Sequence, residues 1–426
     1  MHGFSGHAPR PPQKSRSDFW GPRSFYRRTF AGQAPKRASG KGHGPVFFLA
    51  GETSGDVHAA HLARALGAQF PGLELVGVGG PRMAEAGVQV LVDSSGWGVV
   101  GYAESYVRVP VFVLRFRRVL GLLRRLRPQA LVLVDFPGFN VFVARAASSW
   151  VPTVYYFPPM AHGRKGRRAQ VLAGLPVRVL VTLPFEYEAY KAAGADVAFV
   201  GHPAVDLTRP TRPREALWAD LGLRPGVPLV ALLPGSRTQE VRALLPVQVA
   251  AWQLLRRRGS PVQAAVAVAS ERLRPLVGAV LQHAGVQLPA PTGCTHDLLA
   301  YADAAVVASG TATLEAAVLG TPMVVVYRVS RPTEWIARCV ATVPWVSLPN
   351  LLAGRQVVPE LLQGLCRPDL VAEELEGLLD PGRRQQVQAA LQEVVATLGP
   401  PGAVERAARE VAARVGCGAG REHGVP

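Results

Sequence analysis

Short runs of apolar residues recur along the chain, and stretches with helical periodicity separate many of them. The first run, VFFLA at residues 46–50, is followed by a glycine-containing turn and a helical pattern from about Val57. Further runs occupy residues 73–80, 88–93, 130–136, 153–157, 177–183 and 197–201. Strands that alternate with helices in this way predict a parallel sheet flanked by helices.

The pattern pauses at residues 206–228, where prolines break any helix, and restarts with the apolar run LVALL at 229–233. It predicts two doubly wound, Rossmann-like α/β domains that face each other across a cleft, an N-terminal one over 45–206 and a C-terminal one over 207–380. The amphipathic helices expected within residues 381–426 should pack back on the N-terminal domain. In such sheets ligands bind beyond the carboxyl ends of the strands, so the loops at those ends carry the candidate chemistry.

Composition narrows the class of protein. The chain has 426 residues, of which 48% are hydrophobic, which predicts a globular protein with a sizeable core. The sequence contains no apolar run long enough to cross a bilayer as a helix. Its four cysteines lie far apart without paired spacing, which indicates neither a disulfide framework nor a zinc site and agrees with a reducing cytoplasm.

The net charge of +17 is concentrated at the N-terminus. Residues 1–44 hold nine Lys or Arg against the single acid Asp18, and they are rich in Pro, Gly and Ser. This composition predicts a disordered basic leader, and it lacks the apolar centre of a secretory signal. A wrongly chosen upstream start codon would give the same pattern.

The stretch VASGTATLEAAVLG, residues 307–320, combines a strand end, a glycine turn and a helix. The free N–H groups of a helix start suit an anion, and the small residues there would let one approach. A carboxylate one turn further in repels phosphate, but it can accept hydrogen bonds from a sugar hydroxyl. The stretch therefore indicates either a nucleotide site or only a capped helix. The residues concerned are Ser309, Gly310, Thr311, Thr313 and Glu315.

A second strand-to-helix turn, LLPGSRTQEV at residues 232–241, lies in the same half of the chain. Its Gly235, Ser236 and Arg237 stand where an anion at the helix start would bind, and the arginine fork suits a diphosphate. Two anion-compatible turns in one predicted domain favour a nucleotide site there.

The loop AGETSGD, residues 50–56, follows the first strand of the N-terminal half. Gly55 permits a tight turn, Ser54 can cap a helix, and Glu52 and Asp56 make the loop acidic. The loop matches no phosphate-binding motif. It could bind a sugar or act in domain closure, or it could be a well-capped turn.

Two further polar residues interrupt apolar stretches. Asp135 ends a wholly apolar strand, where a carboxylate is costly unless it has a function or a partner. It could act as a general base for a hydroxyl, or it could cap the next helix. Asn350 lies in residues 345–362, which resemble either a pocket wall or an irregular loop over the core.

Residues 108–127 contain seven arginines and no acid. As a helix, this stretch would carry apolar residues on one side and Arg117, Arg118, Arg124 and Arg125 on the other. Such a helix either covers the sheet or lies on an anionic membrane. Nucleic acid is a weaker interpretation because no binding motif is present. His58 and His61 share a helix face without a third ligand, so no metal site is expected.

Ten motifs in order carry a resemblance that covers the chain from about Val46 to its C-terminus. The sequence resembles the lipid-A-disaccharide synthase family, inverting glycosyltransferases of the two-domain GT-B type. The resemblance implies a UDP-activated 2,3-diacylglucosamine donor and a 2,3-diacylglucosamine 1-phosphate acceptor, joined by a β-1,6 bond with release of UDP. It also implies no metal or other cofactor and a peripheral position on the inner face of the cytoplasmic membrane. The motifs are AGETSGD, GVGGPRM, VGYAE, VDFPGFN, LPFE, VGHP, LLPGSR, ASGTATLE, PMVVVYR and SLPNLLAGR.

The resemblance also implies roles for individual residues. Asp135 would deprotonate the acceptor hydroxyl, and Asn350 would lie at the catalytic cleft. Arg237 would face the diphosphate and Glu315 would hold the uridine ribose. The phosphates would lie against Ser309, Gly310 and Thr311.

The sequence departs from the family pattern at two places. Gly138 stands where the family usually has a second aspartate, and residues 157–164 lack the two tryptophans usual in that loop. A GT-B transferase with another lipid or sugar acceptor therefore remains an alternative. A membrane-associated relative that has lost catalysis is a third, although the joint presence of Asp135, Arg237 and Glu315 speaks against it.

Overall fold

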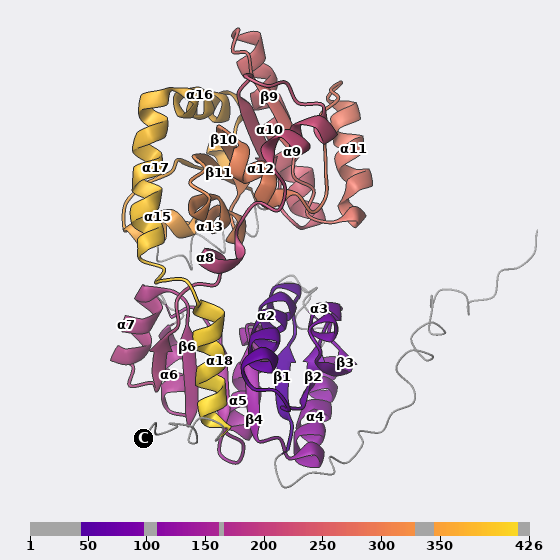
Figure 1. The fold of residues 1–426 in the computed structure, drawn as a ribbon, viewed down its shortest axis with the longest axis vertical. Coiled ribbons are helices and arrows are strands. Elements are labelled where there is room, and N and C mark those ends of the chain that lie inside the picture. Colours follow the sequence, from indigo (N-terminus) through magenta and orange to yellow (C-terminus); the bar gives the residue numbers. More distant parts are fainter. Residues whose placement is uncertain (1–43, 98–108, 162–165, 329–344, 416–426) are drawn as a thin grey trace, which may run out of the picture. The chain divides into compact units, whose positions relative to one another are not determined.

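The computed structural model describes residues 44–97, 109–161, 166–328 and 345–415 (Figure 1). The expected basic leader, residues 1–44, lies outside this range except for Gly44. The described chain forms two parallel sheets with interleaved helices, so the α/β prediction is confirmed.

The first sheet has seven parallel strands in the order β3-β2-β1-β4-β5-β6-β7. Strands β1 and β4 are buried along their whole length, which explains why each is a continuous apolar run rather than an alternating one. Ala50 pairs with Val134, so these two strands end level with each other. The strands are β1 (Val46–Ala50), β2 (Leu75–Gly79), β3 (Gln89–Asp93), β4 (Ala130–Val134), β5 (Thr153–Tyr156), β6 (Val177–Val181) and β7 (Val197–Phe199).

Helices cover both faces of this sheet. One hydrophobic cluster includes Val119 and Leu123 of α4 and Phe139 of α5. The cluster on the other face includes Leu62 of α2 and Val411 of α18. The first helix begins at Thr53, four residues before the position that periodicity predicts. The helices of this half are α2 (Thr53–Gln69), α3 (Pro81–Glu85), α4 (Val109–Leu126), α5 (Pro137–Ala147), α6 (Gly166–Ala173) and α7 (Pro184–Ala192).

The second sheet has five parallel strands in the order β12-β11-β10-β8-β9. Its central strands end within one residue of each other, because Leu233 at the end of β8 pairs with Val307, one residue before the end of β10. The strands are β8 (Leu229–Leu233), β9 (Gln263–Val266), β10 (Ala304–Ala308), β11 (Met323–Tyr327) and β12 (Glu360–Leu362). The helices around it are α8 (Ala204–Leu207), α9 (Arg214–Leu221), α10 (Thr238–Arg257), α11 (Arg274–His283), α12 (Thr295–Tyr301), α13 (Thr311–Val318) and α15 (Leu348–Ala353), with short 3-10 turns at Glu271–Leu273 and Gln363–Leu365.

The C-terminal helices divide between the two sheets. Helices α16 (Pro368–Leu379) and α17 (Pro381–Ala396) belong with the second sheet, because α17 packs against α13, α15 and α16. Only α18 (Ala403–Arg414) packs against α2 and the first sheet. The expectation that all helices of 381–426 pack on the N-terminal domain is therefore wrong for α17, whose Leu391 is buried in the cluster around the second sheet.

Candidate active site

Each sheet has one point where the strand order reverses, and the candidate residues follow the strands beside it. In the first sheet β2 and β4 flank β1, so the loops after β1 and β4 meet at that point. In the second sheet β9 and β10 flank β8, so the loops after β8 and β10 do the same. Crevices at such points are where doubly wound sheets bind ligands.

Asp135 lies on an unusual turn directly after β4. Asp135 and Phe136 both have left-handed backbone conformations, with φ of 52° and 49°. Two consecutive non-glycine residues in this region are energetically costly and persist only where the surroundings hold them. Here the carbonyl oxygen of Asp135 accepts hydrogen bonds from the Asn140 amide at 2.8 Å and the Tyr155 hydroxyl at 3.0 Å. The fold thus fixes this carboxylate at the reversal point of the sheet.

The loop after β1 lies directly against this turn. The Ser54 hydroxyl donates a hydrogen bond to Oδ2 of Asp135 at 2.7 Å. A Cβ at Gly51 would overlap the Phe136 ring, and one at Gly55 would lie 3.2 Å from the carbonyl oxygen of Val134. The glycines therefore allow the close approach that brings Ser54 and Asp135 together.

Glu52 adds a second carboxyl group near Asp135. Burial raises the pKa of Glu52, and the negative charge of Asp135 raises it further. A group with such a pKa binds a proton more readily than an exposed glutamate does. Glu52 can therefore donate a hydrogen bond to a ligand at higher pH than an ordinary glutamate.

Asp56, by contrast, is a structural residue. Its side chain is buried and accepts hydrogen bonds from the backbone N–H groups of Gly80, Arg82 and Met83 at 2.8, 3.0 and 3.1 Å. These bonds satisfy the start of α3. The Asp56 carboxylate is engaged within the fold, as the well-capped turn requires, and a role of the 50–56 loop in binding the acceptor stays a prediction.

Arg237 lies at the start of α10 with its side chain 77% exposed. Gly235, with φ of 106°, makes the turn that leads from β8 to this position. Glu240 holds the turn: it accepts from the backbone N–H groups of Ser236 and Arg237, and from the Arg237 guanidinium at 2.8 Å. Sequence reasoning did not single out Glu240, although an acid three residues after the N-cap is the signal of a capping box. The guanidinium, rather than these amides, is the group available to an anion.

The turn after β10 exposes Gly310 and Thr311 at the start of α13. Gly310 has φ of 155°, and the hydroxyl of Ser309 donates to the carbonyl oxygen of Val346 at 3.2 Å. Thr313 is buried and donates to the carbonyl oxygen of Gly310, so it is not available as a phosphate donor. Glu315 is partly exposed, and Nε2 of His296 lies 3.6 Å from its Oε2.

Asn350 is completely buried and uses both ends of its amide within the fold. Its oxygen accepts from the backbone N–H groups of Val357 and Val358, and its nitrogen donates to the carbonyl oxygen of Val358 and to Glu360. Ser347 also donates to Glu360. Asn350 therefore clamps the loop between α15 and β12, and its place at the catalytic cleft stays a prediction.

Helix α4 covers the first sheet with its apolar side. Val119 and Leu123 are buried, whereas Leu114, the apolar residue out of place in the helical pattern, is 70% exposed. The four arginines expected on the opposite side are exposed: Arg117, Arg118, Arg124 and Arg125. Covering the sheet and contacting a membrane with the other side are therefore compatible roles.

The described residues contain no group of three or more His, Cys, Asp or Glu side chains that could hold a metal ion. Nor do they include a helix long and apolar enough to cross a membrane. Of the departures from the family pattern, Gly138 is exposed with open space around it, and residues 162–164 of the altered loop lie outside the described range.

A family model described as lipid-A-disaccharide synthetase matches residues 46–414. The lipid-A-disaccharide synthase of Syntrophus aciditrophicus (strain SB) is 40% identical over 368 residues, covering 85% of this chain and 96% of that protein. The chain belongs to the lipid-A-disaccharide synthetase family. The synthase of Myxococcus xanthus (strain DK1622) is 39% identical, covering 86% of this chain and 96% of that protein.

Solved structures agree on the fold. CalG4, a calicheamicin glycosyltransferase, has a TM-score of 0.55 at 18% identity and covers 89% of this chain and 100% of its own. A UDP-GlcNAc 2-epimerase from Neisseria meningitidis, solved with UDP-GlcNAc bound, has a TM-score of 0.57 at 10% identity and covers 86% of this chain and 98% of its own. The predicted GT-B type is confirmed. Family membership makes this member a glycosyltransferase that forms the lipid A disaccharide.

Proposed function

We propose that this glycosyltransferase uses Asp135 as the base that activates the acceptor hydroxyl. The acceptor would be an acylated glucosamine 1-phosphate and the donor a UDP-activated acylated glucosamine. The observation that supports Asp135 is its backbone: two left-handed residues in succession, braced by Asn140 and Tyr155 at the reversal point of the sheet. Strain of this kind gathers at functional sites.

The chemistry assigned to Asp135 is a single displacement. The acceptor hydroxyl oxygen bonds to the anomeric carbon of the donor, and the bond from that carbon to the diphosphate oxygen breaks. UDP leaves with the electron pair of the broken bond, and Asp135 takes the proton of the hydroxyl. The Ser54 hydroxyl donates to one carboxylate oxygen, Oδ2, which leaves the other oxygen for the proton.

The nucleotide would bind at the reversal point of the second sheet. The exposed guanidinium of Arg237 suits the diphosphate, and the start of α13 at Gly310 and Thr311 offers N–H groups to it. Ser309 and Ser236 lie in the same two turns. Glu315 would accept hydrogen bonds from the ribose hydroxyls.

Helix α4 is the element that we assign to the membrane. Its exposed arginines suit anionic lipid head groups, and the exposed apolar residues at its N-terminal end, Val111, Val113 and Leu114, suit the acyl region beneath them. The surface it would bind is the inner face of the cytoplasmic membrane, where both acylated substrates would be held.

The domain boundaries follow from the same proposal. Residues 45–206 would form the acceptor and membrane domain, and 207–380 the nucleotide-sugar domain. The short turns 50–56 and 134–140 would belong to the first, and 232–241 and 307–315 to the second.

Replacing Asp135 with asparagine tests the proposal. The asparagine side chain would keep the shape of the aspartate, and asparagine tolerates the left-handed backbone that this position requires. We expect turnover of the acylated acceptor to fall by about 10²–10⁴-fold, the usual contribution of a positioned base, with UDP affinity unchanged. The exposed Asp93, at the end of β3, provides the matched control as Asp93→Asn. Near-normal turnover by the Asp135 variant would make this residue structural.

A further inference from the structure

His296 faces the proposed ribose-binding carboxylate from a neighbouring helix. Its Nε2 lies 3.6 Å from Oε2 of Glu315, and both side chains are about one-third exposed, at 31% and 29%. His296 comes from α12 and Glu315 from α13, and these helices pack against each other. Through this pair, helix α12 contacts the proposed nucleotide site, although the site itself is formed by the turns after β8 and β10.

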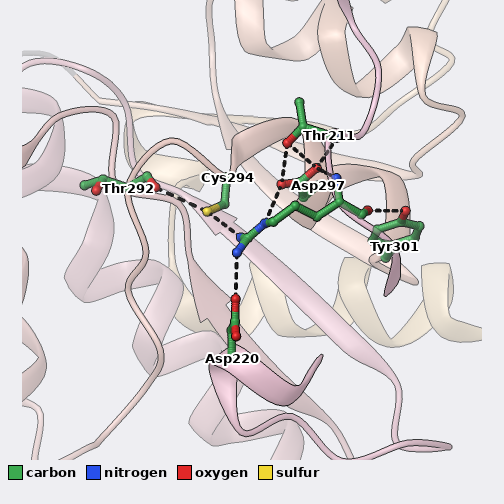
Figure 2. A network of polar contacts seen from close by, with 7 residues as sticks. Thr211, Asp220, Thr292, Cys294, Asp297 and Tyr301 are labelled. Carbon is green, nitrogen blue, oxygen red and sulfur yellow. Dashed lines mark hydrogen bonds and ion pairs between the residues drawn. The ribbon is translucent and has the colours of Figure 1, made fainter. Parts of the chain in front are cut away.

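An ionic network centred on the buried Asp297 holds α12 in place. Asp297, the residue after His296, is 1% exposed and accepts hydrogen bonds from the backbone N–H groups of Thr211 and Arg212 and from the Arg212 guanidinium (Figure 2). Arg212 also pairs with Asp220 and donates to the Cys294 sulfur. The first turn of α12 is thus tied to the segment before α9, which fixes the backbone that carries the His296 imidazole beside Glu315.

The charge of Glu315 creates a difficulty that His296 resolves. A carboxylate one turn into α13 repels a diphosphate bound at the start of that helix, and it weakens the attraction of the helix dipole for the anion. A protonated imidazole beside the carboxylate makes the pair neutral. Glu315 is the main cause of a raised pKa at His296, with a smaller contribution from Asp297, and burial opposes both. Near α12, Arg212 pairs with both Asp220 and Asp297, and Asp303 pairs with Arg384.

We propose that His296 is a positioning residue of the nucleotide site, which orients the Glu315 carboxylate toward the ribose and, when protonated, offsets its charge toward the diphosphate. This inference rests on the proposed function, in which Glu315 binds the ribose. It makes UDP affinity depend on the protonation of His296. Affinity is greatest below the pKa of His296 and falls as the pH rises through it.

Calorimetric titration with UDP tests the inference. The range from about pH 7 to about pH 9 is suitable, because the terminal phosphate of UDP, with a pKa of about 6, is already ionised there. We expect wild-type affinity to fall severalfold across this range. His296→Ala should weaken binding about five- to tenfold at the lower pH, the usual scale of one charge-assisted contact. His296→Gln keeps an N–H donor, so it should recover much of that loss and bind independently of pH.

Two further measurements separate a positioning role from a structural one. In turnover assays, His296→Ala should raise KM for the nucleotide sugar and leave kcat nearly unchanged, because the groups around Asp135 are untouched. Thermal unfolding should show that all variants are folded. The exposed His283 of α11 provides the matched control as His283→Gln.

The outcomes distinguish the inference from the function on which it rests. The role of His296 is overturned if His296→Ala leaves UDP affinity unchanged or if the pH dependence persists in His296→Gln. The ribose assignment stands in that case as long as Glu315→Gln weakens UDP binding. If Glu315→Gln also leaves UDP affinity unchanged, the ribose assignment fails and the inference fails with it.

Discussion

The buried carboxyl group of Glu186 should make stability depend on pH. Glu186 lies in the first turn of α7 and is 5% exposed, and burial raises its pKa from 4.5 to about 8. The folded protein therefore keeps this proton up to about pH 8, whereas the unfolded chain releases it near pH 4.5. The folded state therefore binds more protons than the unfolded state in this interval. The contribution of Glu186 to the free energy of unfolding is complete below pH 4.5, and it falls as the pH rises toward 8.

Glu186→Gln should remove this loss, because the amide has nearly the shape of the protonated carboxyl group and is neutral at every pH. Each rise of one pH unit within the interval lowers the free energy of unfolding of the wild type by about 1.4 kcal/mol. The free energy of unfolding of the variant should therefore exceed that of the wild type by about 3 kcal/mol at neutral pH. The two proteins should differ little at the acid end of the interval.

Urea unfolding of both proteins at about pH 5 and about pH 8 measures the difference, with the shift in midpoint as the readout. Glu188, exposed on the same helix, gives the control variant Glu188→Gln, which should change the midpoint little at either pH. A gain for Glu186→Gln that is equal at both pH values, or no gain at all, would refute the reasoning. Either result would mean that the folded state stabilises the ionised carboxylate.

Asp297→Asn should lower the free energy of unfolding by about 1.5–3 kcal/mol, because the buried side chain would lose its charge and part of its hydrogen bonding to Thr211 and Arg212. Chemical denaturation checks this, with Asp220→Asn at the exposed end of the same network as a control that should cost at most about 1 kcal/mol. Sedimentation with anionic vesicles should weaken steeply as salt rises if α4 lies on lipid, and four Arg→Gln changes on that helix should have the same effect at low salt. The exposed Arg242 and Arg257 of α10 serve as the control pair. If neither salt nor the four changes reduce vesicle binding, α4 only covers the sheet and does not contact lipid. The four positions on α4 are Arg117, Arg118, Arg124 and Arg125.

Local pattern in the sequence was sufficient for the strands and for the loops that matter. A run such as VFFLA can only be a fully buried strand or part of a buried helix, and its length and the glycine after it favour the strand. Val46–Ala50 is the observed strand β1. Since parallel strands place their carboxyl ends at one edge, the positions of Asp135, Arg237 and Glu315 at these edges followed from sequence order, whereas the reversal points are set by the strand order of the fold.

Whether a polar side chain is available to a ligand could not be read from the sequence. Asp56 and Asn350 are polar candidates like Asp135, yet backbone groups of the α3 start engage Asp56 and those of Val357 and Val358 engage Asn350. The left-handed turn at Asp135 could not be predicted from local sequence alone, because a hydroxyl from β5 holds it together with the nearby Asn140. Such partners exist only after the elements have packed.

The sequence by itself determined the order of strands and helices, because burial of apolar residues imposes a local periodicity that each element must follow. The tertiary structure decided which helix covers which sheet and which polar groups meet. Helices α17 and α18 follow one another in the sequence, but one packs on the second sheet and the other on the first. His296 and Glu315 are separated by 19 positions in the sequence and meet because α12 packs against α13. Contacts of this kind depend on the direction in which each side chain points once the core has formed, and periodicity does not record that direction.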